Sequence, residues 1–270
     1  MAKTKAAAKP KKKKKQEAVE NRGITGVGTD YKIYKLSVGQ KLLARLVGFL
    51  IGFAASMVYF NSKILGIILG VICAYKAVPI YRKKLLDNRN KELRLQFRDM
   101  LESLSNSYTV GMTASRAFAA AYNDMVVEHG KDAYITKELQ LINAAHQNQG
   151  YEIKDLLNDF SARSGLEDIR SFAGVFDVSS NLGGDVAKVI RDSRDMIGDK
   201  IEVEMEIQTM VTGQRNQLNV LAVMPLVMSL LTKMIDTGGA STLVITVKIV
   251  ALLLFVFAYW LGTRIVDIKV

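Results

Sequence analysis

The sequence predicts an all-α, multi-pass membrane protein with about four transmembrane helices and a cytoplasmic helical bundle. Three observations support this fold class. Four long apolar runs occur as two pairs, one towards each end of the chain. Lysine and arginine residues flank these pairs mainly on one side. The segment between the pairs repeats apolar residues at helical spacing, with almost no strand-like alternation. The 49% hydrophobic content is also high for a soluble protein of 270 residues.

The first pair of apolar runs comprises residues 42–60 and 64–80, with a short polar turn between them. A helix that rises about 1.5 Å per residue needs roughly 17 to 25 residues to cross about 30 Å of hydrocarbon, so each run is near the required length. Arg45 and Lys76 lie towards the ends away from the turn, where long side chains can reach the same interface. We therefore predict a transmembrane hairpin over residues 42–80.

The second pair comprises residues 218–235 and 243–262, again separated by a short turn rich in small residues. Pro225 lies inside the first of these runs, where a membrane helix tolerates proline if neighbouring groups satisfy the freed carbonyl. Lys248 lies inside the second run, and its side chain can either extend towards the interface or pair with Asp236. These features predict a second transmembrane hairpin over residues 217–264.

Positive charges beside the spans set the predicted orientation, because flanks rich in lysine and arginine stay in the cytoplasm. Residues 1–41 hold eleven lysines and one arginine against three acidic residues. We expect this region to be a basic, largely disordered cytoplasmic tail. The flanking charges also place residues 84–216 and the short tail 265–270 in the cytoplasm, so both termini are predicted to be cytoplasmic.

The central segment, residues 84–216, predicts a bundle of about six helices, each with one apolar stripe. Thr113 is positioned to cap the second helix, and Gly150 is positioned to end the third. A glycine pair separates the fifth helix from a sixth that leads into the third apolar run. The expected stripes are Leu93, Phe97, Met100, Leu101, Leu104 and Tyr108; Ala117, Phe118, Ala121, Tyr122 and Met125; Ile135, Leu139 and Ile142; Ile153, Leu156, Leu157 and Phe160; Ile169, Phe172, Ala173 and Phe176; and Val186, Val189, Ile190, Ile197 and Ile201.

The sequence carries no pattern that predicts catalysis or a cofactor. His129 and His146 are the only histidines and Cys73 is the only cysteine, so a convincing zinc site is not expected. A short Gly-Val-Gly sequence at residues 26–28 is too brief for a dinucleotide fingerprint. We therefore predict that the chain is not an enzyme. The lysine-rich tail lacks the interleaved aromatic residues of a nucleic-acid binder, so no nucleic-acid partner is expected.

An acidic stretch on the sixth predicted helix is the candidate partner face. The candidate contacts are Asp192, Asp195, Asp199 and Glu202, and the stretch continues to Glu204 and Glu206. The simpler interpretation is a solvated helix face with salt bridges. The functional interpretation is a docking face for a basic partner or a divalent cation.

Four sequence blocks carry a resemblance to a known family. They are FRDMLESLSNSYTVGMTASRAFAAAY, with a small-residue turn at Gly111; GYEIKDLLNDFSAR, which begins at Gly150; DIRSFAGVFDVSSNLGGDVAKVI, which contains Gly183 and Gly184; and EVEMEIQTMVTGQRNQLNVLAVMP, which ends at Pro225. In this order they resemble the domain named for the F component of type II secretion systems. A single such domain preceded by two spans is most similar to the platform proteins of tight-adherence (Flp) pilus systems.

The resemblance implies a scaffold in the plasma (inner) membrane for pilus assembly or protein secretion. Its expected partners are a secretion-type ATPase, pilin or pseudopilin subunits, the lipid bilayer and further platform subunits in an oligomer. The family-motif glycines and Pro225 would then have structural roles. The alternative is the membrane component of a transporter or channel, which Pro225 and Lys248 favour. The scarcity of charged residues within the spans argues against that alternative.

Overall fold

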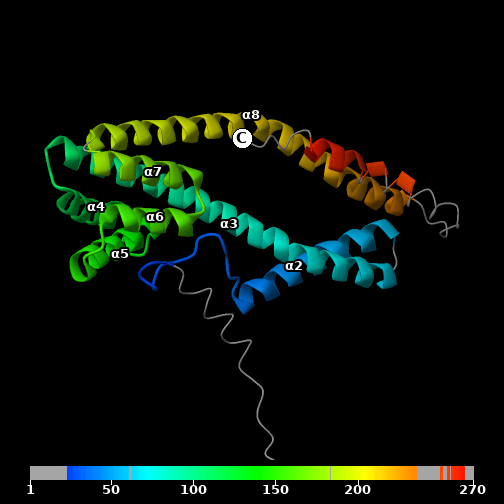
Figure 1. Cartoon of the computed structure of the whole chain (residues 1–270). Coiled ribbons are helices and arrows are strands. Elements are labelled where there is room, and N and C mark those ends of the chain that lie inside the picture. The colour runs from blue at the N-terminus through cyan, green and yellow to red at the C-terminus, as the bar shows by residue number, and fades with distance from the viewer. Residues whose placement is uncertain are drawn as a thin grey trace, which may run out of the picture. The chain divides into compact units, whose positions relative to one another are not determined.

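The computed structural model describes residues 23–60, 63–182, 184–235, 250–251, 254–255 and 257–264, and the regular elements in this part of the chain are helices. They are α2 (Val38–Phe60), α3 (Lys63–Thr109), α4 (Ala114–His129), α5 (Tyr134–Gln149), α6 (Ile153–Ser164), α7 (Glu167–Leu182) and α8 (Val186–Ile235) (Figure 1). The predicted all-helical fold class is confirmed. The tails at residues 1–22 and 265–270, and most of residues 236–256, lie outside the described residues.

The chain divides into two compact units. One unit includes the N-terminal residues up to Tyr34 together with Leu85–Asp199, and it contains the helical bundle. The second unit includes Lys35–Lys84 and the residues from Lys200 onward, and it contains the apolar runs. Helices α3 and α8 each contribute residues to both units.

Two of the described helices are long and apolar enough to cross a membrane. They are Val38–Val58 within α2, and α3. Only 22% of the apolar window of α2 and 11% of that of α3 are buried inside the protein. Large apolar side chains such as Leu43 and Ile64 are therefore exposed, as expected for helices whose surroundings are lipid. The third predicted span lies in α8, whereas much of the fourth, including residues 243–249, lies outside the described residues.

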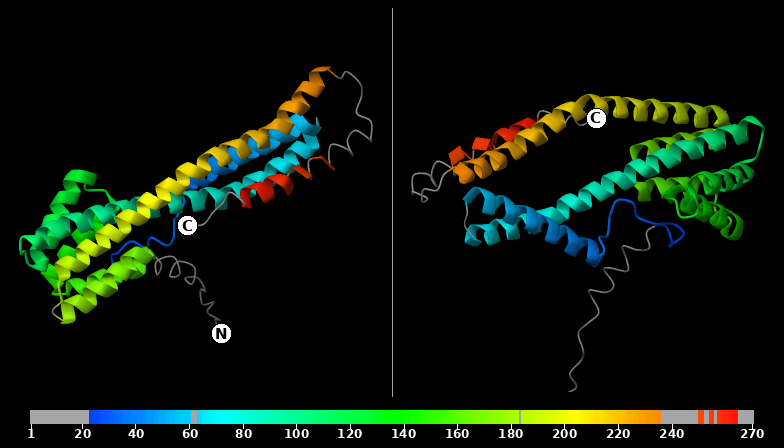
Figure 2. Two further views of the ribbon diagram at one scale, coloured as in Figure 1. Left: turned by 90° about the horizontal axis from the view of Figure 1, so that it is seen from above. Right: turned by 180° about the vertical axis from the view of Figure 1, so that it is seen from behind.

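Glycines allow α2 and α3 to pack closely against each other within the second unit, where Figure 2 shows them side by side. A Cβ atom added at Gly48 would lie 2.7 Å from the Ala77 Cβ atom. One added at Gly52 would lie 3.0 Å from the Gly70 Cα atom. The spacing of Gly48 and Gly52 gives the small-xxx-small pattern through which membrane helices bring their backbones together.

The predicted second span and the first predicted bundle helix form one continuous helix. α3 passes through Pro79 and the basic residues at 82–84 without interruption and ends at Thr109. The basic residues mark a change of polarity rather than the end of a helix, because lysine, arginine, leucine and glutamate are all good helix formers. The predicted boundary between the hairpin and the bundle, at residues 80–84, therefore lies inside one helix.

The apolar stripes predicted for the bundle form its core. Tyr108, Tyr122, Val186 and Val189 are half-buried, and every other residue of the six stripes is buried. Phenylalanine rings from α3, α4, α6 and α7 meet in this core. The rings of Phe97 and Phe172 lie 5.6 Å apart edge to face, a favourable geometry for aromatic pairs.

The segment at residues 23–34 corrects the sequence prediction. It was assigned to the disordered tail, but it lies on the bundle, and we call it the strap. Tyr31 of the strap is 1% exposed, and its backbone N–H donates to the Arg163 carbonyl at 3.0 Å. The prediction failed because the lysine-rich composition of residues 1–22 was taken to describe the whole of residues 1–41. Residues 23–34 contain glycine, threonine and aromatic residues and only one lysine.

Candidate functional site

A buried ion cluster connects α5 and α6 beneath the strap. Arg163 of α6 donates to the two carboxylate oxygens of Glu138 on α5, at 2.8 and 2.7 Å. Its Nε atom donates to Asp159, one helical turn earlier, at 2.8 Å. The three side chains are at most 7% exposed. Such a two-pronged arginine–carboxylate contact is among the strongest hydrogen-bonded pairs in proteins.

The strap satisfies the remaining hydrogen-bonding groups of this ion cluster. The Ile24 N–H donates to the Asp159 carboxylate at 2.8 Å, and the Tyr31 hydroxyl donates to Glu138 at 2.9 Å. The Thr29 carbonyl accepts a hydrogen bond of 3.1 Å from the guanidinium of the cluster. Because buried charges are tolerated only when they are paired and hydrogen-bonded, the strap is part of this ionic core.

Arg89 of α3 holds the strap from a second direction. Its guanidinium donates to the Tyr31 carbonyl, and its Cζ atom lies 5.6 Å from the centre of the Tyr31 ring and 5.3 Å from that of Tyr34. These distances place the cation within range of both aromatic faces. The strap therefore has contacts with α3, α5 and α6.

The environment keeps Tyr31 and Arg163 each in one protonation state. Burial, followed by the negative charge of Glu138 and the hydrogen bond to it, raises the pKa of Tyr31 well above its usual value. Burial by itself would lower the pKa of Arg163, but hydrogen bonds and charge from Glu138 and Asp159 outweigh it and raise that pKa. Tyr31 thus remains a donor and Arg163 a cation throughout the physiological pH range.

A pocket of about 420 Å³ lies between the strap and α5. Thr25 and Val27 of the strap line one side, and Leu141 and Asn148 are among the α5 residues on the other. Its carboxylate, Glu138, already binds Arg163 through both oxygens, so it is not free to act as a base. The described walls of the pocket combine polar and apolar side chains, and its Lys137 pairs with Asp132 at 3.0 Å.

The glycine turns predicted from the family motifs lie together around a second pocket, of about 380 Å³, at one end of the bundle. The turn at Gly111 connects α3 to α4, that at Gly150 connects α5 to α6, and Gly184 precedes α8. Burial raises the pKa of Tyr108 in this pocket to about 12. The lining residues that flank the three turns are Tyr108, Ala114, Ser115, Glu152, Ile153, Lys154, Ser180 and Val186.

Gly111 has the backbone geometry that requires glycine. Its φ angle is 78°, and its N–H donates to the Tyr108 carbonyl at 3.0 Å. The Met112 N–H donates to the Ser107 carbonyl at 3.1 Å, which completes a Schellman motif at the end of α3. Thr113 occupies the N-cap position of α4 as predicted, but its side chain makes no capping hydrogen bond.

The other motif glycines have different roles. Gly150 adopts the left-handed conformation (φ 72°) at the end of α5, as predicted. The Gly184 N–H donates to the Ser179 carbonyl at 2.9 Å, and a Cβ atom there would lie 2.8 Å from the Ser179 hydroxyl. Gly183 lies outside the described residues. Pro225 lies inside α8 and does not end it, and it is remote in sequence from the three turns.

The predicted acidic face lies on α8 and is exposed to solvent. Asp192, Asp195, Asp199 and Glu202 are all exposed. Asp195 pairs with its neighbour Arg194 at 2.7 Å, which offsets part of the negative charge. These four residues belong to the helix that leads into the third apolar run, away from the ion cluster in sequence and in contacts.

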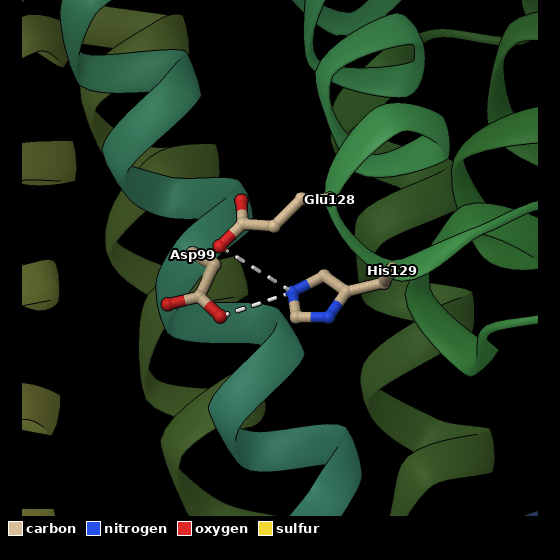
Figure 3. A group of neighbouring side chains, drawn as sticks. All are labelled: Asp99, Glu128 and His129. Atoms are coloured by element: carbon tan, nitrogen blue, oxygen red, sulfur yellow. Dashed lines mark hydrogen bonds and ion pairs between the residues drawn. The ribbon is translucent and has the colours of Figure 1, made fainter.

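His129 at the end of α4 meets two carboxylates (Figure 3). Its Nε2 atom lies 3.0 Å from Asp99 Oδ2 on α3 and 4.0 Å from Glu128 Oε1. This group was not predicted from the sequence, because Asp99 and His129 are thirty positions apart and lie on different helices. His146 is placed differently: its Nδ1 atom contacts the Tyr151 carbonyl at 2.8 Å, beside the end of α5.

The ion cluster was also missed from the sequence. Arg163 and Asp159 are four residues apart on one helix, which indicates a local pair, but Glu138 and Tyr31 are 25 and 132 positions from Arg163. One sequence feature could have indicated the cluster: the charged residues Asp159 and Arg163 lie beside the apolar stripe of residues 153–160. A charged residue at a core-facing position needs a buried partner.

The chain matches no known protein family model, no curated protein and no solved structure.

Proposed function

We propose that this chain is a platform protein of the plasma (inner) membrane in a type II secretion or Flp/type IV-like pilus assembly machine. It couples a cytoplasmic ATPase to the assembly of pilin or pseudopilin subunits, as one member of an oligomeric scaffold. The ordered sequence blocks that resemble the family support this proposal. In the proposed topology, four spans form two hairpins, and the bundle and both termini lie in the cytoplasm.

The main structural support for the proposal is that α8 is one continuous helix. This helix has 50 residues, from Val186 to Ile235, which corresponds to about 75 Å. Its first part supplies Ile190 and Ile197 to the core, and its last part has exposed apolar side chains such as Val223 that suit lipid. A helix that belongs to both a soluble bundle and a membrane hairpin is suited to transmit movement from one to the other.

The ATPase contact is the part of the proposal that binding measurements test directly. The full chain, purified in detergent, should capture the cognate secretion-type ATPase from solution. Reversing the exposed charges of the acidic face (Asp192→Lys, Asp195→Lys and Asp199→Lys) should weaken capture at least about tenfold, because like charges then face the basic partner surface.

The matched control reverses three other exposed acidic residues of the same unit, Asp87→Lys, Glu102→Lys and Asp132→Lys, and should leave capture unchanged. If the unmodified chain never captures the ATPase, the platform function is wrong. Equal loss in both triple variants would instead reject the acidic face as the specific contact.

The proposed orientation predicts a labelling pattern in intact cells. After Cys73→Ala removes the background thiol, single cysteines introduced as Ser62→Cys and Ser241→Cys should react with an impermeant maleimide from outside. Asp132→Cys should react only after the membrane is opened. Asp132 is a suitable reporter because its side chain is fully exposed, at 101%. Labelling of Asp132→Cys in intact cells would contradict a cytoplasmic bundle.

A further inference from the structure

The side chains between the end of α4 and the last third of α3 have the composition of a metal site. Asp99, Glu128 and His129 each offer one ligand atom, and these three atoms lie within 4.8 Å of one another. Figure 3 shows the imidazole of His129 facing the carboxylates from both helices. One imidazole nitrogen and two carboxylate oxygens form a ligand set that zinc and neighbouring first-row divalent ions accept in proteins.

Two of the ligand atoms are spaced to share one ion, and the third comes into range after a small movement. Metal bonds to His nitrogen and carboxylate oxygen are about 2.0 to 2.2 Å long, so two ligand atoms 3.0 Å apart subtend about 90° at a shared ion. The Nε2 atom of His129 and Oδ2 of Asp99 are 3.0 Å apart. The Glu128 oxygen, 4.0 Å from the same nitrogen, completes the set after a small rotation, which its 55% exposed side chain permits.

The partly buried carboxylate of the group is held in the orientation that such a ligand needs. Arg98 donates to Asp99 Oδ1 through Nε at 3.0 Å and Nη2 at 2.7 Å, which leaves Oδ2 directed at His129. Hydrogen bonds of this kind to the non-ligating oxygen are typical around protein-bound metals. The Asp99 and His129 side chains are 13% and 23% exposed, so solvent ions can enter without an opening of the bundle.

The local charge favours a cation. One helical turn along the same two helices, the Ser103 hydroxyl donates to Asp124 at 2.5 Å, so Asp124 adds a third carboxylate to this seam between α3 and α4. Arg98 contributes one positive charge against the three carboxylates when the imidazole is neutral. We propose that Asp99, Glu128 and His129 bind a first-row divalent metal ion, with Zn²⁺ as the best match, that fastens the end of α4 to α3.

The proposal is tested by Zn²⁺ titration of the full chain, purified in detergent without a histidine tag. Calorimetry should give saturable binding of one ion per chain, and Zn²⁺ should raise the thermal unfolding midpoint, since a ligand of the folded state stabilises it. Mg²⁺ should not compete, because it prefers an all-oxygen shell with retained water. Co²⁺ should bind and produce visible absorption bands that shift with ligand replacement.

The variant Glu128→Gln removes an exposed ligand without disturbing the core, and His129→Ala removes the nitrogen ligand. Each should weaken Zn²⁺ binding by about 100-fold or more, since replacing outer-shell partners alone costs 10- to 100-fold. His146→Ala is the matched control and should bind as the unmodified chain does. Two results would overturn the site and leave His129 and Asp99 as a hydrogen-bonded pair. One is the absence of one-to-one binding by the unmodified chain. The other is binding by Glu128→Gln and His129→Ala that is as tight as that of the unmodified chain.

Discussion

Replacing Arg163 by leucine is expected to destabilise the bundle by about 3 to 5 kcal/mol, the range measured when one partner of a buried ion pair is removed. The change leaves Glu138 and Asp159 buried without their common cation. It also frees the Thr29 carbonyl of the strap. The loss should be seen as a lower midpoint in denaturant unfolding of the full chain in detergent, monitored by pulse proteolysis of the bundle.

A surface pair provides the control for this experiment. Arg194 and Asp195 have a similar contact distance, 2.7 Å, but their side chains are 29% and 56% exposed. Arg194→Leu should therefore change stability by no more than about 1 kcal/mol. If Arg163→Leu has no larger effect than Arg194→Leu, the cluster does not stabilise the fold. Trypsin cleavage at Lys32 should also become faster in Arg163→Leu alone, because the strap has lost an anchor.

A compensating variant separates the loss of the charge from the loss of the side chain. Combining Arg163→Met with Glu138→Leu and Asp159→Asn removes the buried charges together, and the asparagine can still accept from the Ile24 N–H. Replacement of buried ion pairs by well-packed apolar groups is often neutral or stabilising. We expect this triple variant to be more stable than Arg163→Leu. A triple variant that is less stable would mean that the strap depends on the ions themselves.

Helix periodicity was sufficient to locate the bundle core from the sequence. Residues such as Phe97, Leu139 and Phe160 follow the steps of three and four that a buried stripe requires, and all are buried. Gly150 ends α5 where expected, because its left-handed conformation is costly for other residues. The buried stripes and the end of α5 depend on local backbone geometry and on the burial of one helix face. Residues that are close together in the sequence determine both.

Contacts between distant segments could not be predicted in the same way. Tyr31 and Glu138 are separated by 107 positions, and nothing in either local sequence specifies the other. The continuity of α3 was missed for another reason. Hydropathy shows where an apolar run ends, but it does not show where a helix ends. The backbone hydrogen bonds of α3 continue through residues 81–92, whose side chains include good helix formers. The His129 group required a pairing between α3 and α4 that only the fold provides.

Two prolines in α8 are expected to abolish pilus or secretion assembly while membrane insertion and ATPase capture persist. The variant carries Glu204→Pro and Gln208→Pro. Each proline removes a backbone hydrogen bond and clashes with the carbonyl four residues earlier, at a cost of about 3 kcal/mol or more. The positions follow the last core residue of α8, Ile201, and precede the apolar part of the helix, so helices α3 to α7 retain their packing residues.

The expected loss follows from the proposed function, because movement of the bundle reaches the second predicted hairpin, residues 217–264, through α8. Glu204→Ala with Gln208→Ala is the matched control: alanine keeps the helix and removes the same side chains, so assembly should continue. The measurements are membrane fractionation, ATPase pull-down with the detergent-purified chain, and surface pilin or secreted substrate. Normal assembly by the double-proline variant would reject mechanical coupling through α8 even if ATPase capture is observed. Failure of the alanine control to assemble would place the requirement in the side chains of Glu204 and Gln208 rather than in the continuity of the helix.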